Sequence, residues 1–478
     1  MRRLVMLPLL FLLTASPALA QSPAAPVTGG QSAGPAGAPA AAPEDNQLRV
    51  TAVPSAVLSP KPAVPVVNKW TATLYGFAEL DTIYDTRQGI NDVPGNPVLP
   101  HAGTYAGYND RTTFSIRNSR VGFRFASPEF NSMRASGLIE MDFYGNQPNA
   151  AGGSSEGSFY NSADLRVRHA AGKLETPYVD LVAGQYWELF GWQPYFHPNT
   201  VEVQGVPGQV YSRTAQLRLS HTFKTDPVNV EIAAAAARPP QRDAGMPDGQ
   251  GGLRLAFNNW KGVRTAGSTG TSIDPLQFGA SGTVRKFALN TPAAGGGVVD
   301  PKAQTTATGW GLSFDGLIPV IPGRADDRSN ALTLTGSYVR GQGIQDQYTG
   351  FANGGSATQQ FAASNAIDAG LVAFDKNGSL QAIHVRSFIV GAQYYLPVDR
   401  GAVWVAANYS QVNSDNADLN AGAPKGAFTR SRWADAALFW DATPAVRFGL
   451  EYAWFENLLV DNTLAHNQRY QLSVFYMF

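Results

Sequence analysis

The sequence of 478 residues contains no cysteine. Disulfide bonds, thiol nucleophiles and thiolate metal sites are therefore excluded. Neither charge is in excess, because 36 basic residues balance 36 acidic ones. Without a basic surplus, no nucleic-acid partner is expected, and any effect of charge must be local.

Long apolar runs are also lacking. A transmembrane helix needs roughly 20 apolar residues, and no stretch of the chain approaches that length. The apolar run at residues 4–13 follows Arg2 and Arg3 and precedes Ala18-Leu19-Ala20, which is the layout of a secretory signal. We expect residues 1–20 to be a signal peptide. An exported chain without such helices can cross a membrane only as a closed β-barrel.

Residues 21–69 are rich in Ala, Pro, Gly and Ser. Proline breaks helices and strands, and the small side chains bury too little apolar surface to offset the entropy of ordering. This composition predicts a disordered periplasmic tether. A cell-wall-binding arm is the alternative.

From Trp70 onward the sequence changes to a period of two. Leu253, Leu255 and Phe257, for example, alternate with Arg254 and Ala256. This alternation is typical of strands with one apolar and one wet face. It predicts an all-β fold for residues 70–478, a sixteen-stranded antiparallel transmembrane β-barrel. The expected strands are 71–84, 111–126, 133–146, 161–174, 178–188, 211–224, 228–238, 251–259, 274–288, 306–319, 330–342, 381–396, 401–413, 428–441, 444–456 and 467–478.

The predicted connections fall into two classes of length. Short links such as 175–177 follow the even-numbered strands, whereas long polar links such as 85–110 follow the odd-numbered ones. Single-chain outer-membrane barrels alternate short periplasmic turns with long external loops in this way. The link at 260–273 is the exception, since it should be short and is not. A soluble β-sandwich or propeller would not explain the alternation, and a barrel of sixteen strands encloses an aqueous channel.

The last strand has apolar side chains on one face throughout. Its aromatic ends lie about 26 Å apart along an extended strand, so they can reach both interfaces of a bilayer. The ending resembles the terminal signal by which outer-membrane barrels are handed to the barrel-assembly machinery. The residues of this expected signal are Tyr470, Leu472, Val474, Tyr476 and Phe478.

Four further segments carry a family resemblance. The stretches "LYGFAELDTIYD" (74–85), "SRVGFRF" (119–125), "RHAAGKL" (168–174) and "LVAGQYWELF" (181–190) resemble trimeric porins, and more narrowly the DcaP-like porins. The resemblance implies a homotrimer in the outer membrane of a Gram-negative bacterium that takes up small anions such as dicarboxylates. It also implies that the third external loop, residues 189–210, folds inward and narrows the pore. That constriction loop would carry Glu202, with Glu188 at its entrance.

Strand parity points a group of basic side chains into the lumen. Their neighbours, such as Phe123, Val167 and Leu217, take the lipid side. Cations that line a narrow pore lower the cost of desolvating an anion, and a guanidinium fork suits carboxylates and phosphates. The alternative is that these arginines only neutralise nearby acids, namely Glu140, Asp142, Asp164 and Asp180. The expected basic wall is Arg124, Arg166, Arg168 and Arg218. Further arginines could extend it, but their direction stays open because the parity of the second strand changes near Asn118; they are Arg111, Arg117, Arg120 and Arg213.

These features favour a porin for passive diffusion of small hydrophilic solutes, without a cofactor. A non-selective general porin and a structural or adhesive barrel are the alternatives. Small outward residues in the first strand, Gly76 and Ala78, indicate a surface for another subunit. An enzyme is not expected, because the six histidines form no recognisable catalytic or metal motif. Two of them, His169 and His221, are expected on the lipid-facing side.

Overall fold

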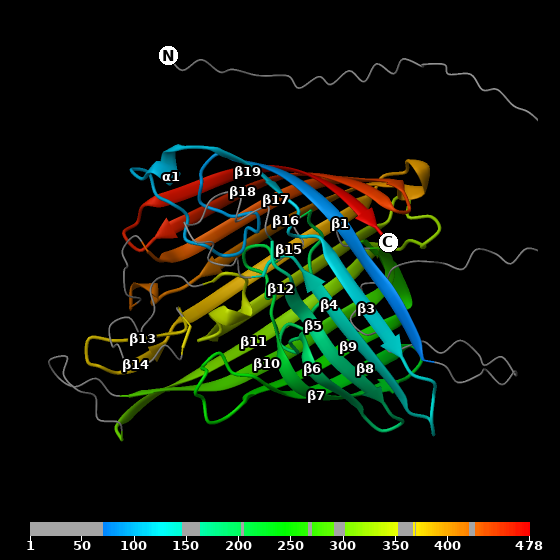
Figure 1. The fold of residues 1–478 in the computed structure, drawn as a ribbon, viewed down its shortest axis with the longest axis horizontal. Coiled ribbons are helices and arrows are strands. Elements are labelled where there is room, and N and C mark those ends of the chain that lie inside the picture. The colour runs from blue at the N-terminus through cyan, green and yellow to red at the C-terminus, as the bar shows by residue number, and fades with distance from the viewer. Residues whose placement is uncertain are drawn as a thin grey trace, which may run out of the picture. The chain divides into compact units, whose positions relative to one another are not determined.

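The computed structural model describes residues 70–145, 163–201, 205–265, 270–290, 302–351, 367–368, 370–419 and 426–478. The signal peptide and tether predicted for residues 1–69 lie outside these ranges. The described residues form an antiparallel β-barrel (Figure 1). The barrel closes where the last strand, in red, pairs with the first, in blue, from Phe77–Met477 to Asp85–Arg469.

The wall has sixteen strand positions, as predicted. Two short strands, β2 and β3, both pair with β1 and together occupy the second position. The residues between them shift the alternation, so Thr113 and Ser115 are buried before the break and Arg120 and Gly122 after it. The predicted change of parity near Asn118 is confirmed. The wall strands are β1 (Thr71–Asp85), β2 (Arg111–Ser115), β3 (Arg120–Ala126), β4 (Arg134–Asp142), β5 (Arg166–Glu175), β6 (Asp180–Trp187), β7 (Arg213–Lys224), β8 (Val228–Ala237), β9 (Asp248–Thr265), β10 (Thr271–Asn290), β11 (Gln304–Ile321), β12 (Leu332–Gln342), β15 (His384–Tyr395), β16 (Val403–Asn413), β17 (Phe428–Thr443), β18 (Val446–Leu459) and β19 (Leu464–Met477).

The two faces of the wall differ in chemistry. On β18, Leu450 and Tyr452 are exposed on the outer face, whereas Glu451 and Ala453 are buried on the inner face. On β19, Tyr470 and Leu472 are exposed and Gln471 is buried. Apolar side chains outside and polar ones inside are the pattern of a membrane-embedded barrel.

The prediction of a long link at residues 260–273 is wrong. Strand β9 continues to Thr265 and β10 begins at Thr271, so only residues 266–270 connect them. The pairing shifts where Pro275 faces Lys261 and Leu276 faces Phe257. The extra residues 258–260 form an irregularity on β9 that interrupts the period of two. The alternation of short and long links therefore holds at this position too.

Small elements occupy the connections. A two-stranded hairpin, β13 (Val372–Phe374) and β14 (Leu380–Ala382), lies between β12 and β15. Short helices complete the set: α1 (Tyr105–Tyr108), η1 (Gln345–Gln347), η3 (Asp399–Gly401) and η4 (Ala417–Leu419). None of the helices in the described ranges is long and apolar enough to span a membrane.

Candidate functional site: the lumen of the barrel

The link between β6 and β7, residues 188–212, contacts wall strands on both sides of the barrel. Near its start, the backbone N–H of Gly191 donates to Ser281 on β10 at 2.8 Å, and the Trp192 indole donates to the Ala280 carbonyl at 3.0 Å. Further along, the Asn199 carbonyl accepts from Asn408 on β16 at 3.0 Å, and the Val201 N–H donates to Glu451 on β18 at 2.8 Å.

The wall side chains that hold this link are buried on the inner face. The described residues of the link therefore contact inner-face side chains of β10, β16 and β18. Apolar packing accompanies the polar contacts, because Val201 belongs to a buried cluster with Phe77, Trp404 and Phe475. Glu202, the predicted acid of this loop, lies outside the described residues.

Three connections meet at one buried point inside the barrel. The Asn96 side-chain amide donates to the Thr349 carbonyl at 2.9 Å, and its oxygen accepts from the Gly208 N–H at 2.9 Å. Thr349 follows β12, Gly208 follows β6 and Asn96 follows β1, so side-chain and backbone bonds tie three distant segments together. We call this the three-loop junction. Asn96 is fully buried there.

Glu188 stands at the start of the β6–β7 link, as predicted, but it is buried against the wall. Its carboxylate accepts a hydrogen bond from Gln250 on β9 at 2.6 Å. The other end of the Gln250 side chain accepts from the N–H groups of Leu189 and Phe190. Burial and the nearby Asp346 raise the pKa of Glu188. Its contacts therefore anchor the first residues of the link.

Two of the four predicted wall arginines lie together on β5. Arg168 is fully buried and donates to Glu140 at 2.7 Å and to Asp142 at 2.9 Å. Arg166 forms a fork with Asp142 at 3.0 and 2.6 Å. Neutralisation of Glu140 and Asp142, the alternative considered from the sequence, thus occurs.

The other two predicted wall arginines have different surroundings. The Arg124 guanidinium lies over the Tyr75 ring, 4.1 Å from its centre. Arg218 donates to the Gln216 side chain at 3.0 Å and to the Trp187 carbonyl. Of the remaining acids considered, Asp180 pairs with Lys173 at 3.0 Å, while the Asp164 carbonyl accepts from the Gly145 N–H. The four predicted arginines do not form one continuous group.

The structure adds two arginines to the Arg166–Arg168 pair. Arg120 lies 3.7 Å from Glu140, and Arg213 lies over the Trp187 ring at 5.1 Å. Among the described residues, no carboxylate lies within ion-pair distance of Arg213, and its Nη1 atom is buried without a hydrogen-bond partner. Four guanidinium groups therefore accompany two carboxylates. We call Arg120, Arg166, Arg168, Arg213, Glu140 and Asp142 the arginine cluster.

Aromatic rings of the β6–β7 link cover this cluster. Tyr211 packs edge-on against Trp187 at 4.8 Å and accepts a hydrogen bond from Arg168 at 2.9 Å. Burial opposes ionisation of Tyr211, but Arg168 and Arg213 outweigh it and lower its pKa. Burial and neighbouring guanidinium groups lower the pKa of His197 to about 3, so it is neutral at pH 7. Of these rings, only that of His197 lies in the aromatic-rich stretch "ELFGWQPYFHP" (188–198), and the sequence offered no signal for Tyr211.

The prediction that His169 faces the lipid is wrong. On β5, Val167 pairs with Met141 and His169 with Glu140, so Arg168 is an extra residue in the register. Such a bulge puts both Arg168 and His169 on the inner face, where His169 is 2% exposed. His221 does share the outer face of β7 with the exposed Leu217, Leu219 and Phe223, as expected. Among the described residues, no group of His, Asp and Glu is placed to hold a metal ion.

Comparisons with known proteins identify the architecture. No protein-family profile and no curated sequence matches the chain. Among solved structures, the outer membrane channel DcaP of Acinetobacter baumannii superposes with a TM-score of 0.60 and 17% identity, over 86% of this chain and 97% of that one. The chain has the fold of an outer-membrane porin.

Two other porin structures are more distant. OmpT of Vibrio cholerae has a TM-score of 0.47 and 13% identity, over 86% of this chain and 98% of that one. Salmonella typhi OmpF, solved in a complex with daunomycin, also has a TM-score of 0.47 and 13% identity, over 85% and 97% of the two chains.

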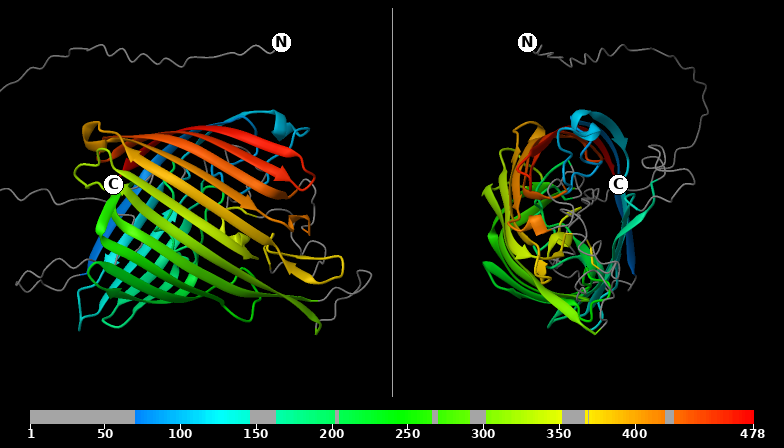
Figure 2. Two further views of the ribbon diagram at one scale, coloured as in Figure 1. Left: turned by 180° about the vertical axis from the view of Figure 1, so that it is seen from behind. Right: turned by 90° about the vertical axis from the view of Figure 1, so that its left-hand side faces the viewer.

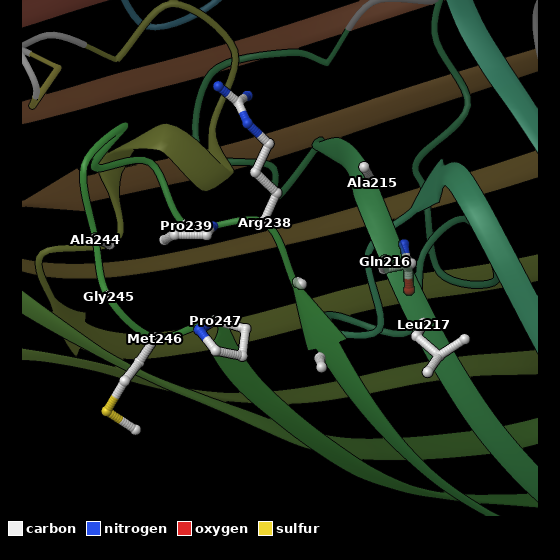
Figure 3. Close-up of a pocket in the computed structure, with 11 residues that line it drawn as sticks. Ala215, Gln216, Leu217, Arg238, Pro239, Ala244, Gly245, Met246 and Pro247 are labelled. Atoms are coloured by element: carbon white, nitrogen blue, oxygen red, sulfur yellow. The ribbon is translucent and has the colours of Figure 1, made fainter.

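One hollow of the porin barrel lies at its rim, apart from the arginine cluster. It has a volume of about 450 Å³ and lies between β7, β8 and the link that follows β8. Figure 3 shows Leu217, Met246 and Pro247 around it and the Arg238 side chain extending away from them. Arg238 is the one ionisable residue among the described lining residues. This hollow thus offers no paired acid and base for catalysis.

The predicted assembly signal forms the outer face of β19. Tyr470, Leu472 and Tyr476 are exposed, and Val474 is partly exposed. Phe478 follows the strand and exchanges backbone hydrogen bonds with Gly76 of β1. The C-terminal residues therefore contribute directly to closure of the porin barrel.

Proposed function

We propose that this barrel is a passive diffusion channel of the outer membrane that favours small hydrophilic anions, such as dicarboxylates. The observation that carries the proposal is the arginine cluster with its surplus of guanidinium groups beside the β6–β7 link. Both of its acids are already paired, so Arg213 retains charge that no described carboxylate balances.

The surroundings of Arg213 support the same function. Its guanidinium lies 5.1 Å from the Trp187 ring centre and 5.3 Å from that of Tyr211. Flat rings fix the orientation of a guanidinium without neutralising it. A carboxylate that enters from water would then receive a charge-assisted hydrogen bond and pay less for desolvation.

The reversal potential in planar bilayers under a potassium chloride gradient tests the proposal. We expect anion preference in the wild-type protein and a clear shift toward cations for Arg213→Gln. Lys376→Gln is the matched control, because Lys376 is exposed in the turn of the β13–β14 hairpin and its loss should leave the potential unchanged.

Three results would contradict parts of the proposal. Cation preference in the wild type would remove the selectivity, and equal behaviour of both variants would remove the role of Arg213. A folded barrel without conductance would favour a structural or adhesive function. Uptake of succinate faster than that of a neutral sugar of similar size, measured with liposomes, would support the dicarboxylate preference.

We further propose that the protein works as a homotrimer and that its last strand is read by the barrel-assembly machinery. The exposed Leu74, Ala78 and Leu80 on the outer face of β1 support a contact with another subunit. The mass of the detergent-solubilised protein tests the trimer proposal. Ala78→Glu should lower this mass from that of three chains to that of one chain. Phe478→Ala should reduce the amount of barrel in the outer membrane without changing its secretion across the inner one.

A further inference from the structure

A group of basic side chains lies on the outer surface of the barrel, near the ends of the strands that lead into long links. Each alternates along its strand with buried residues: Arg340 lies between Val339 and Gly341, and Arg386 between Val385 and Ser387. These cations therefore point away from the lumen. We call the group the outer basic belt; its members are Lys286, Arg340, Arg386, Arg430 and Arg432.

Arg340 and Arg386 are register partners on neighbouring strands β12 and β15. Directly opposite residues on one face of an antiparallel pair have Cβ atoms about 4.5–5.5 Å apart, where like charges repel. Both side chains are exposed, and neither forms an ion pair with a described carboxylate. Two facing arginines without an acid leave a position between them that suits an anion.

The belt continues onto the next strands. Arg386 faces Asn413 on β16, and Asn413 faces Arg430 on β17. Arg430 and Arg432 share one acid, Glu456, at 3.5 and 3.7 Å. The positive charge along this row thus exceeds the negative charge of the described residues beside it.

An aromatic row and an apolar groove lie below the belt. Tyr338 and Phe388, two residues before Arg340 and two after Arg386, are register partners. Two residues of a strand span about 7 Å. The groove has a volume of about 750 Å³ and is lined by Tyr338, Phe388 and Tyr409 above a floor that includes Gly336, Ala392 and Ala407.

The groove opens on the lipid-facing side of the wall. The left panel of Figure 2 faces this side, where the green and yellow strands run across the front of the barrel. Its lining combines glycine and alanine on adjacent strands with larger aromatic and aliphatic residues, an apolar composition that suits a flexible hydrocarbon chain. A position for an anion above a slot for an acyl chain matches the two halves of a phosphorylated lipid.

We propose that this wall binds a phosphate-bearing lipid of the outer leaflet, with a phosphate between Arg340 and Arg386 and an acyl chain in the groove. Long links face the outside in single-chain outer-membrane barrels, so the belt lies at the outer leaflet. A phosphate in this position replaces the repulsion between the two arginines with charge-assisted hydrogen bonds. The site is independent of what the lumen conducts.

Bisphosphorylated lipid A, titrated into phosphatidylcholine nanodiscs that contain the purified full-length protein, is the probe. We expect Arg340→Gln/Arg386→Gln to weaken lipid A binding by about tenfold or more, because each arginine at an anionic surface contributes separately. Lys224→Gln/Lys261→Gln, at the opposite strand ends of β7 and β9, should bind like the wild type.

The thermal unfolding midpoint shows whether each variant is folded. In phosphatidylcholine alone, Arg386→Gln should unfold at the wild-type temperature or higher, because it removes the repulsion with Arg340. With lipid A present the order should reverse, since the wild type gains more from the lipid. This reversal is not expected from a purely structural role of either arginine.

Three outcomes would overturn the proposal. The first is equal lipid A binding by the Arg340/Arg386 double variant and the wild type. The second is equal stabilisation by inorganic phosphate at matched concentration, which would indicate an ion site rather than a lipid site. The third is a lower oligomeric mass of the double variant, which would show that this face contacts a second copy of the chain.

Discussion

Gly76 and Phe478 exchange two backbone hydrogen bonds, at 2.9 and 3.0 Å, across the seam of the barrel. A Cβ atom on Gly76 would lie 2.3 Å from the backbone carbonyl oxygen of Arg120 on β3 and 2.9 Å from the Phe478 ring. The absence of a side chain on Gly76 therefore provides space for both the backbone of β3 and the C-terminal ring. This small residue, expected from the sequence to face another subunit, has a packing partner within its own chain.

Gly76→Val should weaken closure of the barrel. The added branched side chain would collide with the Arg120 carbonyl of β3 and with the Phe478 ring, and would disturb the pairing of β1 with both β3 and β19. We therefore expect a lower unfolding temperature on heat-shift gels. Ala72→Val is the matched control, because Ala72 is exposed on the same face of β1 and is not among the residues proposed for the subunit contact. Equal stability of the two variants would contradict this role of Gly76, because it would show that the β3 backbone and the ring both make room for a side chain.

Arg168→Gln should destabilise the fold more than any other change in the predicted basic wall. Glu140 and Asp142 would both lose a short ion pair inside the barrel, and breaking a buried pair costs roughly 3–5 kcal/mol. Arg124→Gln removes only a contact with the Tyr75 ring, worth about 0.5–1 kcal/mol. Denaturant unfolding of the two variants measures the difference, and a larger loss for Arg124→Gln would contradict this order.

Asn96→Ala should make the channel current unsteady. The substitution removes two side-chain hydrogen bonds from the three-loop junction, the buried one with Gly208 and the part-buried one with Thr349. The β6–β7 link thereby loses a contact that limits its movement. Single-channel recordings should show more frequent partial closures. Asn109→Ala, which removes one exposed hydrogen bond in the same link after β1, should record like the wild type. A quiet Asn96→Ala channel would mean that the junction does not control the link.

His197 should make the fold less stable in acid. Its pKa is about 3 in the folded chain against an ordinary value of 6.5. As the pH falls below 6.5, His197 binds a proton in the unfolded chain but stays neutral in the folded chain. Stability is therefore lost between pH 6.5 and 3. At pH 5 the loss reaches at most about 2 kcal/mol. His197→Phe should therefore lose less stability than the wild type between pH 7 and 5; parallel curves would argue against the buried neutral ring.

Most of the wall of the barrel was predictable because most wall strands obey one local rule. Alternation of apolar and polar residues places β18 and β19 within a few residues of their observed bounds. The rule fails where an extra residue interrupts it, as at Arg168 on β5 and at residues 258–260 on β9. A single sequence does not mark such residues, because they look like ordinary members of the pattern.

The candidate site was predictable only in part. Parity expected Arg166 and Arg168 opposite the exposed Val167, and the structure agrees on that point, but parity failed for the next residue, His169. That these arginines line the pore stays a prediction. The addition of Arg120 and Arg213 depends on the break between β2 and β3 and on the path of the β6–β7 link. Contacts such as that of Asn96 with Gly208 join residues from different links, and local patterns carry no information on which links meet.

The three-loop junction also limits how this protein can be altered. External loops of barrels are the usual places for insertions and foreign epitopes, since changes there rarely disturb the wall. Here the links that contain Asn96, Gly208 and Thr349 share hydrogen bonds, so a longer segment in one of them would displace the other two. Substitutions in these three links should accordingly accumulate together in related chains, as correlated changes rather than independent ones.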